Sequence, residues 1–269
     1  MNSATKPKIA VHKFSSCDGC QLSFLNTGED LITLSKLVDI VHFAEAGILS
    51  PNEKVDIAFI EGSMTTSEEV ERIHKIRENS KYLIAIGACA TAGGIQALRN
   101  FSNSNVEKWK NKIYERPETI NSLPTSTPVS AHVNVDLEIW GCPPSSSQIY
   151  TTIRCYLSGV TADIPQDALC LHCKRKNIVC VLVAKGLNCM GPVTKTGCGV
   201  LCPSKDRECY NCFGPAENIN CLSLGKRFQE LDLSNEEISR RFLLINNSAP
   251  AFKKWGEYFK KMAHKENII

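Results

Sequence analysis

The sequence lacks any apolar run long enough to span a membrane. Its first residues, MNSATKPKIAVHKF, hold neither a secretory hydrophobic region nor a twin-arginine signal. It also lacks a charge excess, because a formal net charge of +3 is too small to favour nucleic acid or a membrane surface as a partner. We therefore expect a cytoplasmic protein with no direct membrane span and no nucleic-acid partner.

Histidine residues with metal-ligand spacing are lacking, whereas cysteine is abundant. His12, His42, His74, His132 and His264 show no metal-ligand spacing. The chain has 14 cysteines among 269 residues. Because the cytoplasm keeps thiols reduced, structural disulfides are not expected there. Metal binding is the leading interpretation of this cysteine content.

Residues 1–160 alternate strand and helix patterns, which predicts a parallel sheet covered on both faces. The expected order is flavodoxin-like. Thr66 and Glu69 form a capping box for one helix, and Ser145 with Gln148 can cap another. Residues 101–131 are expected to form a long surface loop. The expected strands are 8–14, 39–46, 55–62, 82–90 and 137–144, with a helix over 21–38.

From about residue 161 the periodicity fades, and cysteines crowd between Cys170 and Cys221. This segment has little apolar material for a core, so we expect bound metal to hold it together and to couple binding to folding. The stretch from about 222 is expected to be helical and polar. We predict a smaller, irregular cluster-bearing domain over 161–269, following a flavodoxin-like domain over 1–160.

Four cysteines lie just beyond predicted strand ends. Cys17 and Cys20 follow the first strand, Cys89 the fourth and Cys142 the fifth. Because the carboxyl ends of parallel strands meet at one edge, these side chains are expected to converge. Four thiolates suit a [4Fe–4S] cluster or a structural zinc ion. A thioredoxin-like pair at 17 and 20, with Cys89 as a core thiol, is the simpler alternative, but it leaves Cys142 unexplained.

The later run contains eight further cysteines, enough for two four-thiolate sites. A zinc ribbon would use the two CxxC pairs and leave the four cysteines between them without a role. Cys155 lies in an amphipathic helix and is expected to be a core thiol, whereas Cys221 has no assigned role. We expect His172 to be solvated or to support a ligand. The eight are Cys170, Cys173, Cys180, Cys189, Cys198, Cys202, Cys209 and Cys212.

Several motifs together resemble the small, electron-transfer subunit of [NiFe]-hydrogenases. They are SCDGCQLSFL, IEGS, GACATAGG, WGCPPS and CMGPVTKTGC with the later CYNCFGP. The sequence is most similar to the cytoplasmic, NAD(P)-coupled type, also known as the sulfhydrogenase delta type. The resemblance extends from about residue 8 to residue 221.

This resemblance implies three [4Fe–4S] clusters and no catalytic residue on the chain itself. Partners would be a large subunit that holds nickel and a flavin or Fe–S subunit that uses NAD(P) or sulfur. Cys170 stands where better-known relatives often have histidine, and the medial set has four cysteines instead of three. The implied ligand sets are proximal, Cys17, Cys20, Cys89 and Cys142; distal, Cys170, Cys173, Cys180 and Cys189; and medial, Cys198, Cys202, Cys209 and Cys212.

Three alternatives remain open at the level of sequence. A complex I-like Fe–S subunit should end soon after the α/β domain and carry one cluster. An F420-linked hydrogenase small subunit differs only in its partner. A zinc-binding interaction protein would contain zinc without sulfide.

Overall fold

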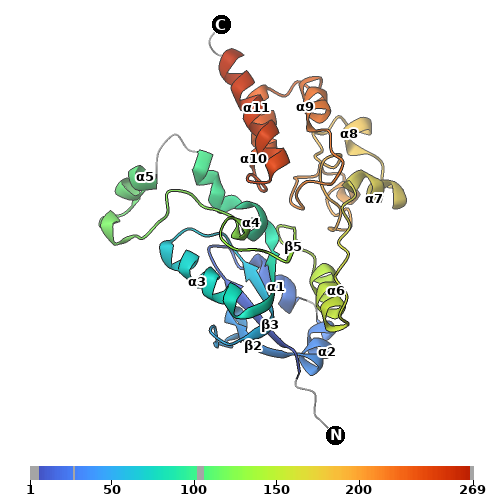
Figure 1. Ribbon diagram of the computed structural model, residues 1–269. Helices are drawn as coiled ribbons and strands as arrows, with labels where there is room; N and C mark the ends of the chain where they lie inside the picture. The colour runs from blue at the N-terminus through green and yellow to red at the C-terminus, as the bar shows by residue number, and fades with distance from the viewer. Residues whose placement is uncertain (1–5, 27, 102–105, 267–269) are drawn as a thin grey trace.

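A computed structural model describes residues 6–26, 28–101 and 106–266 (Figure 1). In this part of the chain, five parallel strands form one sheet in the order β2-β1-β3-β4-β5. This is the flavodoxin-like order, so the predicted fold class is confirmed. The strands are β1 (Lys8–Lys13), β2 (Asp39–Phe43), β3 (Val55–Glu61), β4 (Ser80–Ile86) and β5 (Leu137–Ile139).

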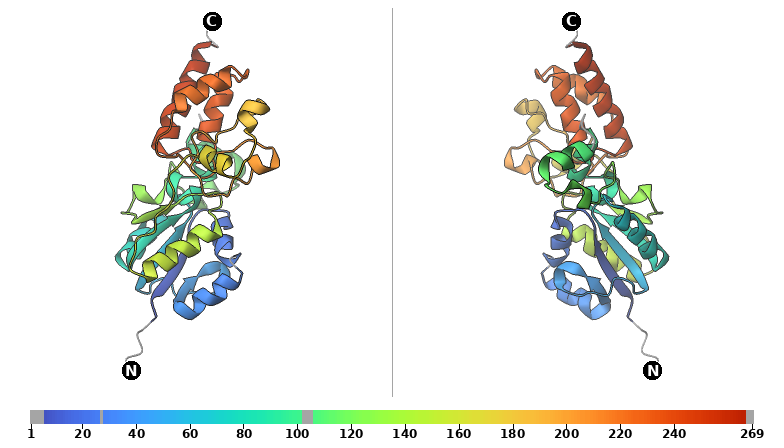
Figure 2. Two further views of the ribbon diagram at one scale, coloured as in Figure 1. Left: turned by 90° about the vertical axis from the view of Figure 1, so that its right-hand side faces the viewer. Right: turned by 90° about the vertical axis from the view of Figure 1, so that its left-hand side faces the viewer.

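Each face of the sheet has its own apolar core, because successive side chains of a buried strand point to opposite faces. Ile57 and Phe59 of β3 belong to one core, and Ala58 and Ile60 to the other. Helices cover both faces, as the two side views show (Figure 2). The first core packs against α1 (Gly19–Leu25), α2 (Glu29–Leu37) and α6 (Ser146–Leu157), and the second against α3 (Ser67–Glu78) and α4 (Gly87–Ala92).

The predicted helix starts are confirmed at two positions. The Thr66 hydroxyl accepts from the Glu69 N–H while the Glu69 carboxylate reaches back, which completes the capping box of α3. The Ser145 hydroxyl accepts from the Gln148 N–H at the start of α6. Both helices therefore begin where a side-chain oxygen satisfies an otherwise unpaired backbone donor.

Other boundaries differ from the sequence-based expectation. The helix expected over 21–38 is divided into α1 and α2, because Gly28 adopts φ +61° before the second helix starts. The strand expected over 82–90 ends at Ile86, and α4 follows at once. The loop expected over 101–131 contains the helix α5 (Val106–Ile113), while its residues 102–105 lie outside the described part.

The C-terminal segment contains a third apolar core. The expected helical tail is present, but its inward side carries the buried Phe228, Phe242, Phe252 and Phe259. Each lies on the inward side of a helix whose sequence is polar on average. The tail expected to be polar therefore supplies apolar material that the cysteine-rich stretch before it was expected to lack. The helices of this segment are α7 (Leu169–Arg175), α8 (Val181–Ala184), α9 (Cys221–Gln229), α10 (Asn235–Leu243) and α11 (Pro250–Glu266).

The third core also contacts the sheet region. Ala92 of α4 is part of it, and Trp140, just after β5, packs against it. Gly214 lies so close to the Trp140 ring that an added Cβ would stand 2.1 Å from it. A domain boundary near residue 160 stays a prediction. No helix in the described ranges is long and apolar enough to cross a membrane.

Candidate metal centres

The four proximal cysteines gather at the carboxyl edge of the sheet. Cys17 lies in the turn after β1, Cys20 in α1, Cys89 in α4 and Cys142 directly after β5. The N–H of Ala88 donates to the Gly141 carbonyl at 2.8 Å, which joins the start of α4 to the end of β5. Cys89 therefore approaches from a helix and not from the strand end that the sequence suggested.

Burial and mutual proximity disfavour the charged forms of these thiols. The pKa of Cys89 is raised to about 12, first by burial and then by the nearby sulfurs of Cys142 and Cys17. The pKa of Cys20 is raised well above its ordinary value, first by burial and then by Glu61, Cys89 and Cys142. Thiols gathered this closely can ionise together only when a cation compensates their charge, so this donor set fits a bound metal centre.

Two glycines leave room beside the sulfurs. Gly87 has φ +82°, and a Cβ there would lie 2.2 Å from Cys20 Sγ. Gly94 has φ +61°, and its Cβ would lie 2.5 Å from Cys89 Sγ. Side chains at these positions would occupy the space next to the thiols, so glycine is required for both conformation and volume.

Sequence reasoning did not assign a role to Glu61, the last residue of β3. Its side chain is fully buried. One carboxylate oxygen accepts from the Cys20 N–H at 2.9 Å, and the other accepts from the Gln21 side chain at 2.9 Å. Glu61 therefore holds the first turn of α1 against the sheet edge. In the sequence, Glu61 could have been noticed as an acidic residue at the end of an apolar strand.

The distal set also comes together in the structure. Cys170 and Cys173 lie on α7, Cys180 immediately precedes α8, and Cys189 follows in the next loop. A Cβ on Gly191 would lie 3.3 Å from Cys189 Sγ and 3.7 Å from Cys170 Sγ. The pKa of Cys170 is raised to about 11 by burial and by its three companions.

The medial set lines a cavity of about 230 Å³. Cys198, Cys202, Cys209 and Cys212 all contribute to its wall, and so does Cys142 of the proximal set. The pKa of Cys212 is raised to about 12, first by burial and then by the sulfurs of Cys198, Cys142 and Cys202. The fit is good for a group bound by thiolates, because all four cysteines of the set line one cavity.

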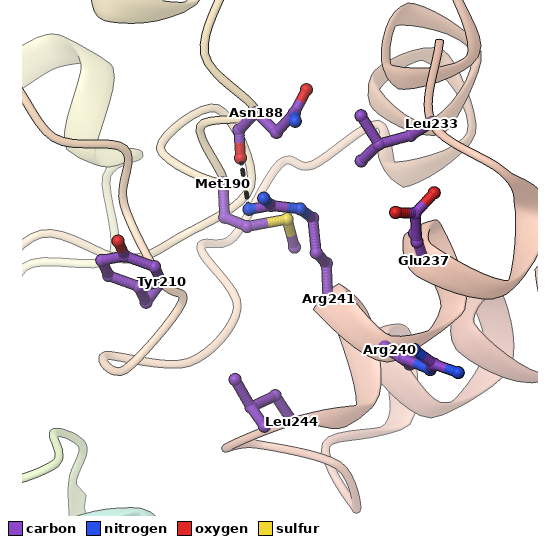
Figure 3. A pocket seen from close by; sticks show the side chains of 8 residues that line it. All are labelled: Asn188, Met190, Tyr210, Leu233, Glu237, Arg240, Arg241 and Leu244. Atoms are coloured by element: carbon purple, nitrogen blue, oxygen red, sulfur yellow. Dashed lines mark hydrogen bonds between the residues drawn. The ribbon is translucent and has the colours of Figure 1, made fainter. Parts of the chain in front are cut away.

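The distal and medial sets are adjacent to each other as well. The Cys209 N–H donates to Cys189 Sγ at 3.3 Å. Next to this contact lies a cavity of about 340 Å³, which the segment at 188–190, Tyr210 and α10 enclose (Figure 3). Arg241 of α10 donates to the Asn188 carbonyl at 2.8 Å across this cavity, so the helix fixes the loop that carries Cys189.

Two cysteines and one histidine stay outside the three sets. Cys221 is 1% exposed at the start of α9, and burial alone raises its pKa to about 12. It belongs to the third apolar core, as a structural thiol does. Cys155 lies within α6. The His172 ring pairs through Nδ1 with the Thr196 hydroxyl at 3.0 Å, which suits a supporting role.

All fourteen cysteines are free thiols and lie in the described ranges. Within those ranges, no three His, Cys, Asp or Glu side chains are spaced to hold a single metal ion together. Four-sulfur donor sets are typical of zinc or of iron–sulfur clusters. The structure thus brings each predicted set together, while the identity of what it binds is a separate question.

Comparisons with known proteins address that question. The family model described as NADH ubiquinone oxidoreductase, 20 Kd subunit, matches residues 17–156. Sulfhydrogenase 2 subunit delta of Pyrococcus furiosus is 31% identical over 234 residues, covering 87% of this chain and 97% of that relative. The NAD-reducing hydrogenase HoxS subunit delta of Cupriavidus necator is 30% identical, covering 62% of this chain and 86% of that relative.

A solved structure is similar to part of this chain. A chain of an NAD+-reducing [NiFe]-hydrogenase in the H2-reduced state superposes with a TM-score of 0.55 at 29% identity. The match covers 60% of this chain and 96% of that one. The similarity therefore extends over nearly the whole of the solved chain.

Proposed function

Because this chain belongs to the NADH:ubiquinone oxidoreductase 20 kDa subunit family, and within it to the hydrogenase small subunits, we propose the following role. It transfers electrons between the nickel–iron site of a large subunit and a flavin or Fe–S partner. The partner uses NAD(P) or sulfur. The chain itself carries no proposed catalytic residue.

Family membership implies iron–sulfur clusters, and we propose three of the [4Fe–4S] type. The proximal, distal and medial sets defined above would hold one each. When bound, such clusters supply one-electron transfer at potentials that ligation, burial and hydrogen bonding adjust. The protein's own contribution is to fix four sulfurs per site, to exclude water and to bring donor groups close to the sulfurs.

One observation carries this proposal: the three sets form a continuous series. Cys142 of the proximal set and Cys212 of the medial set share the same cavity. Cys209 of the medial set contacts Cys189 of the distal set through a backbone hydrogen bond. Adjacent sites of this kind suit stepwise electron transfer, whereas independent structural zinc sites would have no need to adjoin.

The proximal site is open on one side. Cys17, Cys142 and Pro143 are exposed, whereas Cys20 and Cys89 are buried. A cluster at this edge would need cover from solvent, and we propose that the large subunit provides it. Such a contact would be extensive and long-lived, as in obligate complexes.

The acceptor partner would dock at the distal end. Exposed apolar side chains flank Cys180 there, with Val183 78% and Val179 64% accessible, and Leu201 of a neighbouring loop is 65% accessible. The Lys176 ammonium donates to the Gly199 carbonyl at 2.9 Å, which places α7 beside the loop that carries Leu201. An apolar centre next to basic residues suits a partner with an acidic rim.

The alternatives are weaker on these observations. A complex I-like subunit with one cluster leaves the distal and medial cysteines unused. A zinc-binding interaction protein does not account for the hydrogenase relatives. An F420-linked subunit differs only in its partner. The cytoplasmic location stays a proposal, which rests on the content of free cysteine.

Anaerobic affinity purification of the tagged chain tests this function. We expect a nickel-containing large subunit and a flavoprotein to copurify, and the complex to reduce NAD(P) or sulfur with H2. Purification of the chain with neither partner, or H2-dependent reduction of F420 alone, would contradict the proposal. Val183→Asp should release the flavoprotein and retain the large subunit, because Val183 is 78% exposed on the acceptor face and does not line the cavity of the medial set.

A further inference from the structure

A three-residue segment, Thr194 to Thr196, contacts all three cysteine regions. The Thr194 hydroxyl donates to the Met190 carbonyl at 2.7 Å and lies beside the sulfur of Cys209. The Thr196 hydroxyl pairs with His172, which stands between two distal cysteines. Lys195 lies between these threonines, so its side chain is positioned by contacts on both sides.

The Lys195 side chain is buried at the junction of the proximal and medial sets. It is 6% exposed, and Nζ stands 5.1 Å from the centre of the Trp140 ring. Its N–H donates to the Gly214 carbonyl at 2.9 Å. Trp140 is two residues before Cys142, and Gly214 is two residues after Cys212. The backbone of Lys195 is thus bound to the segment after Cys212, and its ammonium lies over the ring of Trp140, which packs against the same Gly214.

Two neighbouring groups stabilise the charged form of Lys195 in this position. Burial lowers its pKa, and the negative charge of Glu138 on β5 opposes that effect. The face of the Trp140 ring offers further stabilisation to a cation. The interaction is reciprocal, because Lys195 lowers the pKa of the Glu138 carboxyl that burial raises.

We propose that Lys195 is a positioning residue whose fixed positive charge raises the reduction potentials of the clusters at the proximal–medial junction. The inference rests on the proposed cluster binding. One-electron reduction adds one negative charge to a cluster and needs no proton from Lys195. A buried cation stabilises that added charge more strongly than a surface cation does, because water and salt screen it less.

Potentiometric titration of the purified complex, followed by electron paramagnetic resonance, tests this charge effect. Lys195→Gln should make reduction at the junction about tenfold less favourable, equivalent to a shift of about 59 mV to more negative potential. Lys195→Arg should restore most of the original value. Glu138→Gln should shift the same potentials in the positive direction. The distal potential should move less than the others in every variant.

A matched control is Lys226→Gln, which removes an exposed charge from α9. It should leave the junction potentials in place at high salt, whereas the Lys195→Gln shift should persist there. Unchanged potentials in both Lys195→Gln and Glu138→Gln, with full iron content, would overturn the inference. An equal shift of all three potentials would overturn it too. Absence of iron and sulfide would instead contradict the proposed function.

Discussion

The proximal cysteines and the eight that follow them are held in place by different means. The proximal set stands at the edge of a sheet with an apolar core on each face. The distal and medial sets lie on short helices and irregular loops. In the first region the backbone is fixed before any metal arrives. In the second, the loops pack against the core of α9 to α11 and are joined by scattered hydrogen bonds, with no regular sheet beneath them in the described part of the chain.

Removal of iron should therefore affect the two regions very unequally. After anaerobic chelation, we expect amide hydrogens over residues 168–215 to exchange nearly as fast as in an unfolded chain, because metal binding and folding are coupled there. The strands β1, β3 and β4 should stay protected. Hydrogen exchange with mass spectrometry measures both. Equal loss of protection in the sheet would contradict this comparison.

The second largest effect is expected from the aromatic core of the C-terminal helices, which stabilises the folded chain. Phe228 is fully buried in it, so Phe228→Ala is expected to lower the free energy of unfolding by about 3–5 kcal/mol. Urea unfolding followed by circular dichroism measures this change. Ile113→Ala is the control, because Ile113 is 63% exposed and should cost less than about 0.5 kcal/mol. Similar values for both variants would show that the loops depend on metal alone.

A backbone change can disturb the proximal site and leave the sheet intact. Gly87→Ala places a Cβ against Cys20 Sγ, so we expect loss of proximal iron and a reduction of H2-dependent electron transfer by about 10–100-fold. Gly47→Ala is a matched control, because Gly47 has φ +73° and open space around it. Gly47→Ala should lower the free energy of unfolding by about 1 kcal/mol and leave the iron content unchanged. Equal iron loss in both variants would contradict the argument from volume.

The last prediction concerns pH and the sheet region. The pKa of His12 is lowered to about 3, first by burial and then by His42 and Arg72. Between about pH 6.5 and 3, His12 is therefore protonated in the unfolded state and neutral in the folded state. Stability is complete above pH 6.5 and falls as the pH decreases, by up to about 1.4 kcal/mol per pH unit. His12→Leu should reduce this slope in acid titrations of stability. An unchanged slope would mean that His12 is protonated in the folded chain.

The sequence predicted regular elements much better than irregular ones. The strands, the Thr66 capping box and the Ser145 cap follow from periodicity and side-chain chemistry, which act locally. The convergence of the proximal cysteines followed from one rule about parallel strands. The break at Gly28 and the helical setting of Cys89 depend on backbone conformations that the pattern alone did not reveal.

In the C-terminal segment, the cysteine content indicated eight ligands for two sites, and only the resemblance to a known family implied how they divide into sets. The contact between Cys189 and Cys209 depends on loops whose course no periodicity determines. The Phe residues of α9 to α11 were missed because their helices are polar on average, although each has an apolar side. Nothing in the sequence indicated that Lys195 is buried, because its contact with Trp140 depends on how distant segments fold together.

Analysis of iron, zinc and acid-labile sulfide in the anaerobically purified chain tests the central claim most directly. The account predicts about twelve irons with an equal amount of sulfide. It also predicts the loss of about four irons in each of Cys20→Ser, Cys173→Ser and Cys212→Ser. Zinc without sulfide, or iron that is unaffected by these substitutions, would contradict it.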